Sequence, residues 1–184
     1  MSQGQLLTTT PDSKHQIGKN ENRTSGGPTA EQRPIQRVIV LGTGLPAIAA
    51  FIVPGLDHRL GWSSVPPGIS LVGDLFIVLS MGLVYRVFRE NSFGSATVEI
   101  RQDQRVISTG PYAIVRNPMY ASAAVYFVGL SLALGSYWGL VASILTTLGL
   151  VWRLSDEEAF LAQNLPGYTD YCAKVRWHLI PRVF

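Results

Sequence analysis

Residues 117–152 read NPMYASAAVYFVGLSLALGSYWGLVASILTTLGLVW and contain no charged side chain. Residues 38–56, VIVLGTGLPAIAAFIVPGL, are also uncharged. A helix needs about 20 apolar residues to cross a bilayer. The whole chain of 184 residues is 47% hydrophobic and only 15% charged, whereas a soluble domain is about a quarter charged. We therefore predict an all-α integral membrane protein.

Proline, glycine and polar residues divide the apolar segments into about four transmembrane helices. We predict helices at 35 to about 53, about 69–88, 118 to about 134 and about 140–152. The first should stop at Pro54-Gly55, because proline and glycine break regular elements. Asp74 lies near the start of the second helix, where we expect an interfacial or packing role. The stretch 1–34 is polar and lacks an apolar core, which predicts a disordered tail rather than a signal peptide.

Lysine and arginine alternate between the segments that join these helices. Five of them lie in the tail to residue 37, one in the first loop, five in the stretch 86–116, none in the next turn and four in the part from residue 153. Cytoplasmic loops of membrane proteins carry the excess of Lys and Arg. The pattern predicts four spans with both termini, and a C-terminal helical cap, on the cytoplasmic side.

Other functional classes find little support in the composition. The net charge is +3 and the pI about 9.2, but the basic residues form no stripe, so we expect no nucleic-acid partner. Cys172 is the single cysteine and the three histidines are far apart in the sequence. We therefore predict no internal disulfide and no metal site.

A rigid polar segment, STGPYAIVRNPMY, precedes the long uncharged run at residues 108–120. Each proline fixes its own φ and biases the residue before it towards an extended conformation. Pro118 suits the first position of the third helix. The segment is either a well-made entry loop, with Arg116 and the tyrosines at the headgroups, or the floor of a binding site.

The C-terminal part, RLSDEEAFLAQNLPGYTDYCAKVRWHLIP, spans residues 153–181. Ser155 can cap a new helix whose first turn is acidic. Alternatively, the fourth helix continues and makes Arg153 and Glu157 neighbours at i and i+4. Tyr168 and Tyr171 stand three residues apart on a short helix that ends before Pro181, a spacing typical of packing.

These motifs, in this order, resemble the isoprenylcysteine carboxyl methyltransferase family, which is related to the membrane phospholipid N-methyltransferases. The resemblance rests on GPYAIVRNPMY, a helical hairpin, R-x-x-x-E-E, LPGYTDY and V-R-x-x-L-I-P, over about residues 104–181. It implies a membrane-embedded S-adenosylmethionine-dependent methyltransferase, with residues 35–103 as N-terminal helices and start of a connector and 104–184 as the methyltransferase core.

The resemblance also implies the site residues. The cofactor-binding positions are Gln104, Arg105, Val106, Ile107, Tyr112, Asn117, Pro118, Met119, Tyr120 and Glu157. Arg153 matches the substrate-side arginine, and Glu158 is the second acid with a catalytic role. The choice between Glu157 and Glu158 for the cofactor stays open. Many members have histidine where this chain has Asn117, which leaves the role of this position in proton transfer open.

We expect the methyl acceptor to be lipophilic and to reach the site from the bilayer. A carboxylate acceptor is already ionised near neutral pH and needs only an arginine such as Arg153. An amine must first lose a proton, which requires a base; Glu157 and Glu158 are the candidates. We favour O-methylation of an isoprenylcysteine-like carboxylate. The alternatives are N-methylation of a phospholipid or another small molecule, a non-catalytic membrane-bound relative, and a small transporter subunit.

Overall fold

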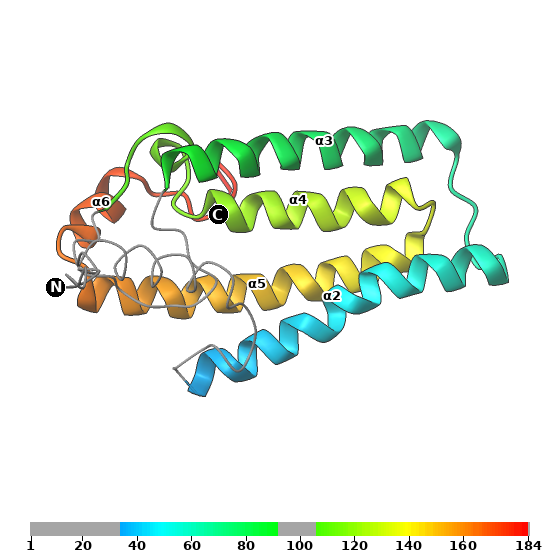
Figure 1. The fold of residues 1–184 in the computed structure, drawn as a ribbon, viewed down its shortest axis with the longest axis horizontal. Coiled ribbons are helices and arrows are strands. Elements are labelled where there is room, and N and C mark those ends of the chain that lie inside the picture. The colour runs from blue at the N-terminus through cyan, green and yellow to red at the C-terminus, as the bar shows by residue number, and fades with distance from the viewer. Residues whose placement is uncertain (1–33, 92–105, 184) are drawn as a thin grey trace, which may run out of the picture.

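The computed structural model of the protein describes residues 34–91 and 106–183, with side chains from residue 38. All regular structure in these two ranges is helical, and the predicted all-α class is confirmed. Residues 1–33 of the predicted tail and residues 92–105 of the connector lie outside the described ranges. The helices, drawn in Figure 1, are α2 (Pro34–Leu60), α3 (Pro67–Glu90), the short 3₁₀ helix η1 (Gly110–Ala113), α4 (Pro118–Ala133), α5 (Tyr137–Asn164) and α6 (Tyr168–Lys174).

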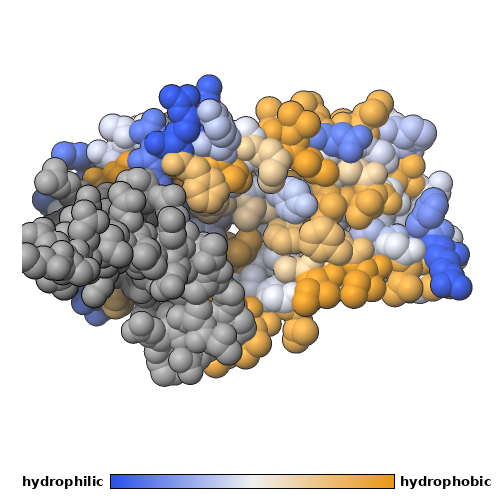
Figure 2. Space-filling model, viewed as in Figure 1, coloured by the Kyte–Doolittle hydropathy of each residue, from blue (hydrophilic) through white to orange (hydrophobic). Residues whose placement is uncertain are grey.

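The four long helices run side by side, with α4 between its neighbours (Figure 1). Helix α4 packs against both α3 and α5, and α2 covers α5. By length and composition, α2 from residue 38, α3 and α5 can each cross a membrane, and α4 is a shorter apolar helix of 16 residues. The visible face is apolar over much of the middle of the bundle, and hydrophilic residues gather at its right-hand end and at the upper left of the view (Figure 2).

The interface between α3 and α4 has its closest approach at two glycines. A Cβ atom on Gly73 would lie 2.3 Å from the backbone nitrogen of Ala133 and 2.7 Å from the carbonyl oxygen of Gly129. Small residues let membrane helices approach this closely, since van der Waals packing rather than hydrophobic burial drives their association. This contact holds α4 against α3.

Two predicted helix ends are wrong. Helix α2 does not stop at Pro54-Gly55 but continues to Leu60. Proline is tolerated inside membrane helices because neighbouring helices and hydroxyl side chains satisfy the freed backbone groups, and Pro54 is fully buried beside Gly139 of α5. Helix α5 does not end near Trp152 but continues to Asn164. The predictions for α3 and α4 agree with the structure within two residues at each end.

The loops at one end of the bundle meet at a buried carboxylate. Asp57 has no exposed surface. It accepts a hydrogen bond from the backbone N–H of Ser63, at 2.8 Å, and bonds from the hydroxyls of Ser63 and Ser136. Ser136 in turn caps α5 by accepting from the N–H of Gly139 at 2.9 Å. Asp57 therefore joins the end of α2 to the α4–α5 turn.

Candidate functional site

The charged and polar side chains of interest gather at the opposite end of the bundle. There the end of α3, η1, the start of α4, the last part of α5 and α6 come together (Figure 1). The C-terminal strap, residues 175–180, completes this end. The backbone N–H of Arg116 donates to the carbonyl of Trp177 at 2.8 Å, and that of Asn117 donates to the carbonyl of His178 at 3.0 Å. These segments, which are distant in the sequence, thus form one end of the bundle.

Local sequence features place the start of α4. Pro118 is buried at the first helical position, where its missing N–H costs nothing. Gly110 opens η1 with φ of +57°, and a Cβ there would lie 2.6 Å from Cγ of Glu90. Glu90 also accepts a hydrogen bond from the hydroxyl of Thr109 at 2.9 Å. The residues before α4 are therefore tied to the end of α3.

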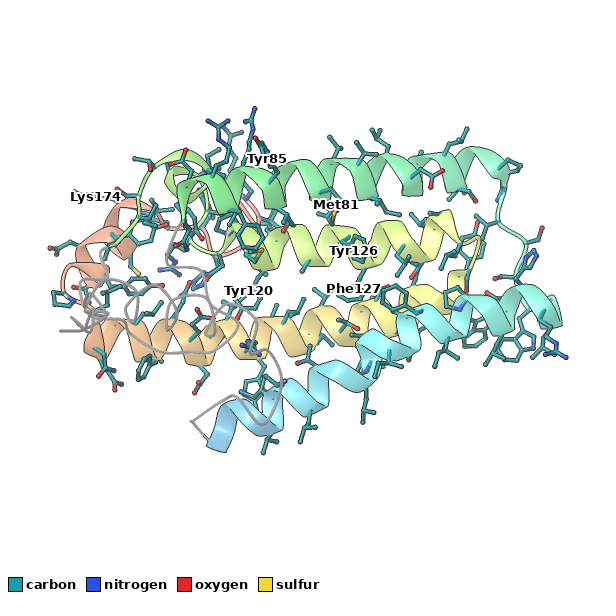
Figure 3. The ribbon with its side chains drawn as sticks, in the orientation of Figure 1. Met81, Tyr85, Tyr120, Tyr126, Phe127 and Lys174 are labelled. Atoms are coloured by element: carbon teal, nitrogen blue, oxygen red, sulfur yellow. The ribbon has the colours of Figure 1, made fainter. Side chains whose placement is uncertain are left out.

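Tyr120 lies at the centre of the first side-chain cluster, at the end of α4 that lies towards α6 (Figure 3). Its hydroxyl donates to Oε2 of Glu157 at 2.6 Å and accepts from Nε of Arg153 at 3.0 Å. Arg153 and Glu157 are one turn apart on α5, so their side chains reach the same phenol. Glu157, Tyr120 and Arg153 thus form a hydrogen-bonded chain of carboxylate, phenol and guanidinium across the α4–α5 interface.

Glu158 is the centre of the second cluster. One carboxylate oxygen accepts from the side-chain amide of Asn117, and the other lies 3.2 Å from Nη2 of Arg116 and 3.0 Å from Nδ1 of His178. Arg116 Nη2 also lies 2.7 Å from Nδ1 of His178. The side chains of Arg116 and Glu158 are only 10% and 11% exposed. The acid is therefore held by groups from the start of α4 and from the strap.

Tyr112 connects η1 to α6 and α3. Its carbonyl accepts from the hydroxyl of Tyr171 at 2.7 Å, and its own hydroxyl accepts from Asn91 at 2.9 Å. Burial raises the pKa of the Tyr112 phenol above its usual value. Burial likewise raises the pKa of Tyr171 and of Tyr168. These phenols therefore stay protonated at neutral pH, and the Tyr171 hydroxyl donates to the Tyr112 carbonyl.

The structure brings most of the predicted site residues together. Tyr120, Arg153 and Glu157 share one contact chain, and Asn117 and Glu158 share another. The remaining predicted positions within the described residues are half-buried or buried at the same end, namely Val106, Ile107, Tyr112, Pro118 and Met119. Val106 packs against the cluster of Leu165, Tyr168, Tyr171 and Val175. Gln104 and Arg105 lie outside the described residues.

The structure decides one of the two open choices at the end of α5, and for the other it shows that the two acids have different partners. Ser155 does not cap a new helix; its hydroxyl donates to the carbonyl of Val151 at 2.8 Å inside α5. The continuous-helix alternative is correct, and it places Arg153 and Glu157 on one face. Glu157 and Glu158 point to different partners, because consecutive helical residues lie about 100° apart around the axis.

Sequence reasoning missed His178 and the side-chain role of Arg116. One of the two interpretations of its segment placed Arg116 at the lipid headgroups, whereas its guanidinium is nearly buried against Glu158. His178 was set aside because the three histidines lie far apart in the sequence. The V-R-x-x-L-I-P motif contained the available signal, since it includes His178 and follows the short helix that returns the chain to the site.

A protein-family model matches the part of the chain that runs through α3, α4 and α5. The model described as phospholipid methyltransferase matches residues 69–166, just over half of the chain, from the start of α3 to just past the end of α5. No match is found among curated proteins. The matched segment contains Tyr120, Arg153 and the Glu157–Glu158 pair. The chain belongs to the phospholipid methyltransferase family, a family of membrane methyltransferases.

Proposed function

We propose that the protein transfers a methyl group from S-adenosylmethionine to a lipophilic acceptor at the charged end of its helix bundle. The observation that carries this proposal is the contact of Tyr120 with both Arg153 and Glu157. Family resemblance assigns these two α5 residues to acceptor and cofactor respectively. A phenol that touches both would lie where the two reactants have to meet.

The residues present fit the cofactor. S-Adenosylmethionine supplies a methyl group activated on a cationic sulfur, and it also carries an ammonium and a carboxylate. Glu157 offers a carboxylate for the cationic groups, and the faces of Tyr112 and Tyr120 suit a sulfonium or an adenine ring. Arg116 Nε is a buried donor without a hydrogen-bond partner among the described residues. Such donors are costly to leave unpaired, so an acceptor atom of a ligand would stabilise this site.

Positioning and electrostatics are the main contributions that a protein makes to a methyl transfer. Arg153 would hold an anionic acceptor, and Tyr120 would keep its guanidinium in place through the 3.0 Å contact. Asn117 and its partner Glu158 would fix the start of α4. The connector would add Gln104, Arg105, Val106 and Ile107 as further cofactor contacts, together with Pro118 and Met119 at the start of α4.

We favour a carboxylate on an isoprenylcysteine-like acceptor. Transfer to a carboxylate forms an O–CH₃ bond, breaks the S–CH₃ bond and releases no proton. Arg153 then suffices as the acceptor-holding group, because the carboxylate is ionised at neutral pH. The apolar exterior of α3 and α5 would keep such an acceptor in the bilayer beside the site (Figure 2).

N-methylation of a phospholipid amine is the second candidate, and two observations favour it. The matching family model is described as phospholipid methyltransferase. In addition, Glu158 and His178 lie 3.0 Å apart, and such a pair can accept the proton that an amine loses. This candidate uses the same cofactor residues but requires a base.

Membrane topology completes the proposal. The alternation of lysine and arginine favours four spans with both termini and the site on the cytoplasmic side. Residues 104–184 would then form the methyltransferase core, and residues 35–103 the N-terminal helices and the start of the connector. A cysteine-labelling assay in intact cells, with single cysteines at residues 62 and 176, would test the orientation.

The first experiment is equilibrium binding of labelled S-adenosylmethionine to detergent-purified protein. Glu157→Gln should abolish saturable binding, whereas Arg153→Ala should retain it and Asp74→Asn, at an exposed acid of α3, should bind like the parent. Absence of binding by the folded parent protein would refute the proposal.

Acceptor class is then decided by methyl transfer to an S-prenylcysteine analogue and to phosphatidylethanolamine. A methyl ester releases methanol in alkali, and an N-methyl group does not. Alkali-labile label on the prenylcysteine supports the first candidate, and alkali-stable label on the phospholipid supports the second. Binding without transfer to any acceptor would favour a non-catalytic relative.

A further inference from the structure

His178 reaches the site from the far end of the chain. The strap is held by two backbone hydrogen bonds from residues 116 and 117, and its side chains Val175 and Leu179 are buried. The backbone that carries the imidazole is therefore held at the start of α4.

Solvent reaches the imidazole more easily than its partners. The side chain of His178 is 32% exposed, against 11% for Glu158 and 10% for Arg116. Histidine is the side chain that ordinarily changes charge between pH 5 and 8. His178 is therefore the most exposed of the three side chains and the one of a type that can take up a proton in this pH range.

The contacts of Nδ1 depend on where the protons are. Nδ1 lies 2.7 Å from Arg116 Nη2 and 3.0 Å from Glu158 Oε2, and Nε2 also contacts Arg116 Nη2. A ring nitrogen either accepts or donates, so a neutral ring with its proton on Nδ1 can donate to Glu158 and accept from Arg116 through Nε2. Once both ring nitrogens carry protons, the imidazolium and the guanidinium flank a single carboxylate.

We propose that His178 is a positioning residue of the methyl-transfer site, which sets the net charge around Glu158 and, through its contact with this acid, the surroundings of the Asn117 amide. The inference rests on the proposed function, because it assumes that the cofactor lies against Asn117. With neutral His178, Arg116 and Glu158 balance each other. With protonated His178, the cluster gains one positive charge beside the place proposed for a cationic cofactor.

The expected direction follows from this charge. S-Adenosylmethionine carries a net positive charge below about pH 7, where its α-amino group stays protonated. Protonation of His178 should therefore weaken cofactor binding as the pH falls. An added unit charge at protein-interior separations, partly screened by salt, corresponds to a loss of about three- to tenfold in affinity.

Other charged groups near His178 leave this direction unchanged. Glu158 faces it from α5 and Arg116 from the segment before α4, and neither needs to change charge. Tyr168 of α6 is influenced by the charges of both residues, and burial raises its pKa, so the phenol stays neutral below pH 8. Arg176, which is exposed on the strap itself, keeps its charge throughout.

The test measures the dissociation constant of S-adenosylmethionine by calorimetry between pH 5.5 and 7 for the full-length protein, His178→Gln and His58→Gln. His58 is exposed near the opposite end of the bundle and serves as the matched histidine control. The parent and His58→Gln should lose about three- to tenfold in affinity as the pH falls, whereas the affinity of His178→Gln should stay level. A purely structural role would lower the affinity of His178→Gln equally at each pH.

Each contrary result has a distinct meaning. A parent affinity that is level with pH, or an unchanged pH dependence in His178→Gln, overturns the inference while the proposed function stands. Absence of binding by the parent at every pH overturns both. If His178→Gln does not fold, the same comparison is made with His178→Asn, which must show the level profile.

Discussion

The contact between Gly73 and Gly129 gives a sharp prediction about stability. In Gly73→Ala, the new Cβ would meet three backbone atoms at 2.3–2.8 Å, namely Ala133 N, Gly129 O and Leu132 C. Backbone atoms cannot rotate away as a side chain can, so α3 and α4 have to separate. Ordinary contacts of a Cβ atom begin near 3.4 Å, which implies a displacement of roughly 1 Å. Overpacking of this kind costs about 1–3 kcal/mol.

Gly82 of the same helix provides the matched control. A Cβ there would have no atom within 4 Å, so Gly82→Ala changes helix propensity without a clash. Alanine is better than glycine in a helix interior by about 1 kcal/mol, which also partly offsets the clash in Gly73→Ala. The free energy of unfolding, measured in mixed detergent micelles with increasing SDS, should fall for Gly73→Ala and stay level or rise for Gly82→Ala. Equal stability of the two variants would refute the close approach of α3 and α4.

Three further predictions concern the two ends of the bundle. Tyr120→Phe should weaken S-adenosylmethionine binding by roughly tenfold, since hydrogen bonds to charged groups contribute about 1.5–3 kcal/mol; Tyr126→Phe on the same helix is the calorimetric control, and equal affinities would contradict the role of the Tyr120 hydroxyl. Asp57→Asn should lower the thermal unfolding midpoint more than Asp74→Asn does, because only Asp57 is buried among hydroxyl and N–H donors. Burial raises the pKa of Tyr171 above that of an unfolded tyrosine, so stability should be level from pH 7 to about 9.5 and decline above about pH 10. A Tyr171→Phe variant should show a smaller decline in the same thermal unfolding series, and an identical decline would exclude Tyr171 as its source.

The bounds of a helix could be predicted from the sequence where a single local rule determines its ends. Helices α3 and α4 are apolar segments that begin at prolines, and their bounds were predicted within two residues. The end of α2 was missed because proline and glycine were treated as in water. Inside the bundle, Pro54 packs against α5 and Asp57 gains its donors from Ser63 and Ser136, and these tertiary contacts outweigh the local preference.

The candidate site was predictable to the extent that its residues share one helix or one motif. The continuation of α5 past Ser155 was one of two alternatives, and local capping rules could not choose between them. The choice depends on Tyr120, a residue 33 positions before Arg153, which gives the arginine and Glu157 a common partner. Contacts between separate helices of this kind are invisible to periodicity.

His178 shows the same limit in a stronger form, because 62 residues separate it from Arg116. No spacing rule links these two residues, and a lone histidine after a short helix ordinarily has no functional meaning. The link arises because the strap pairs its backbone with the residues that start α4, and this pairing delivers the ring to Glu158. Where the resemblance leads one to expect histidine at position 117, the chain instead places an asparagine and a histidine on opposite sides of one carboxylate. Substitutions at residues 117 and 178 should therefore be assessed by how they change the net charge around the Glu158 carboxylate.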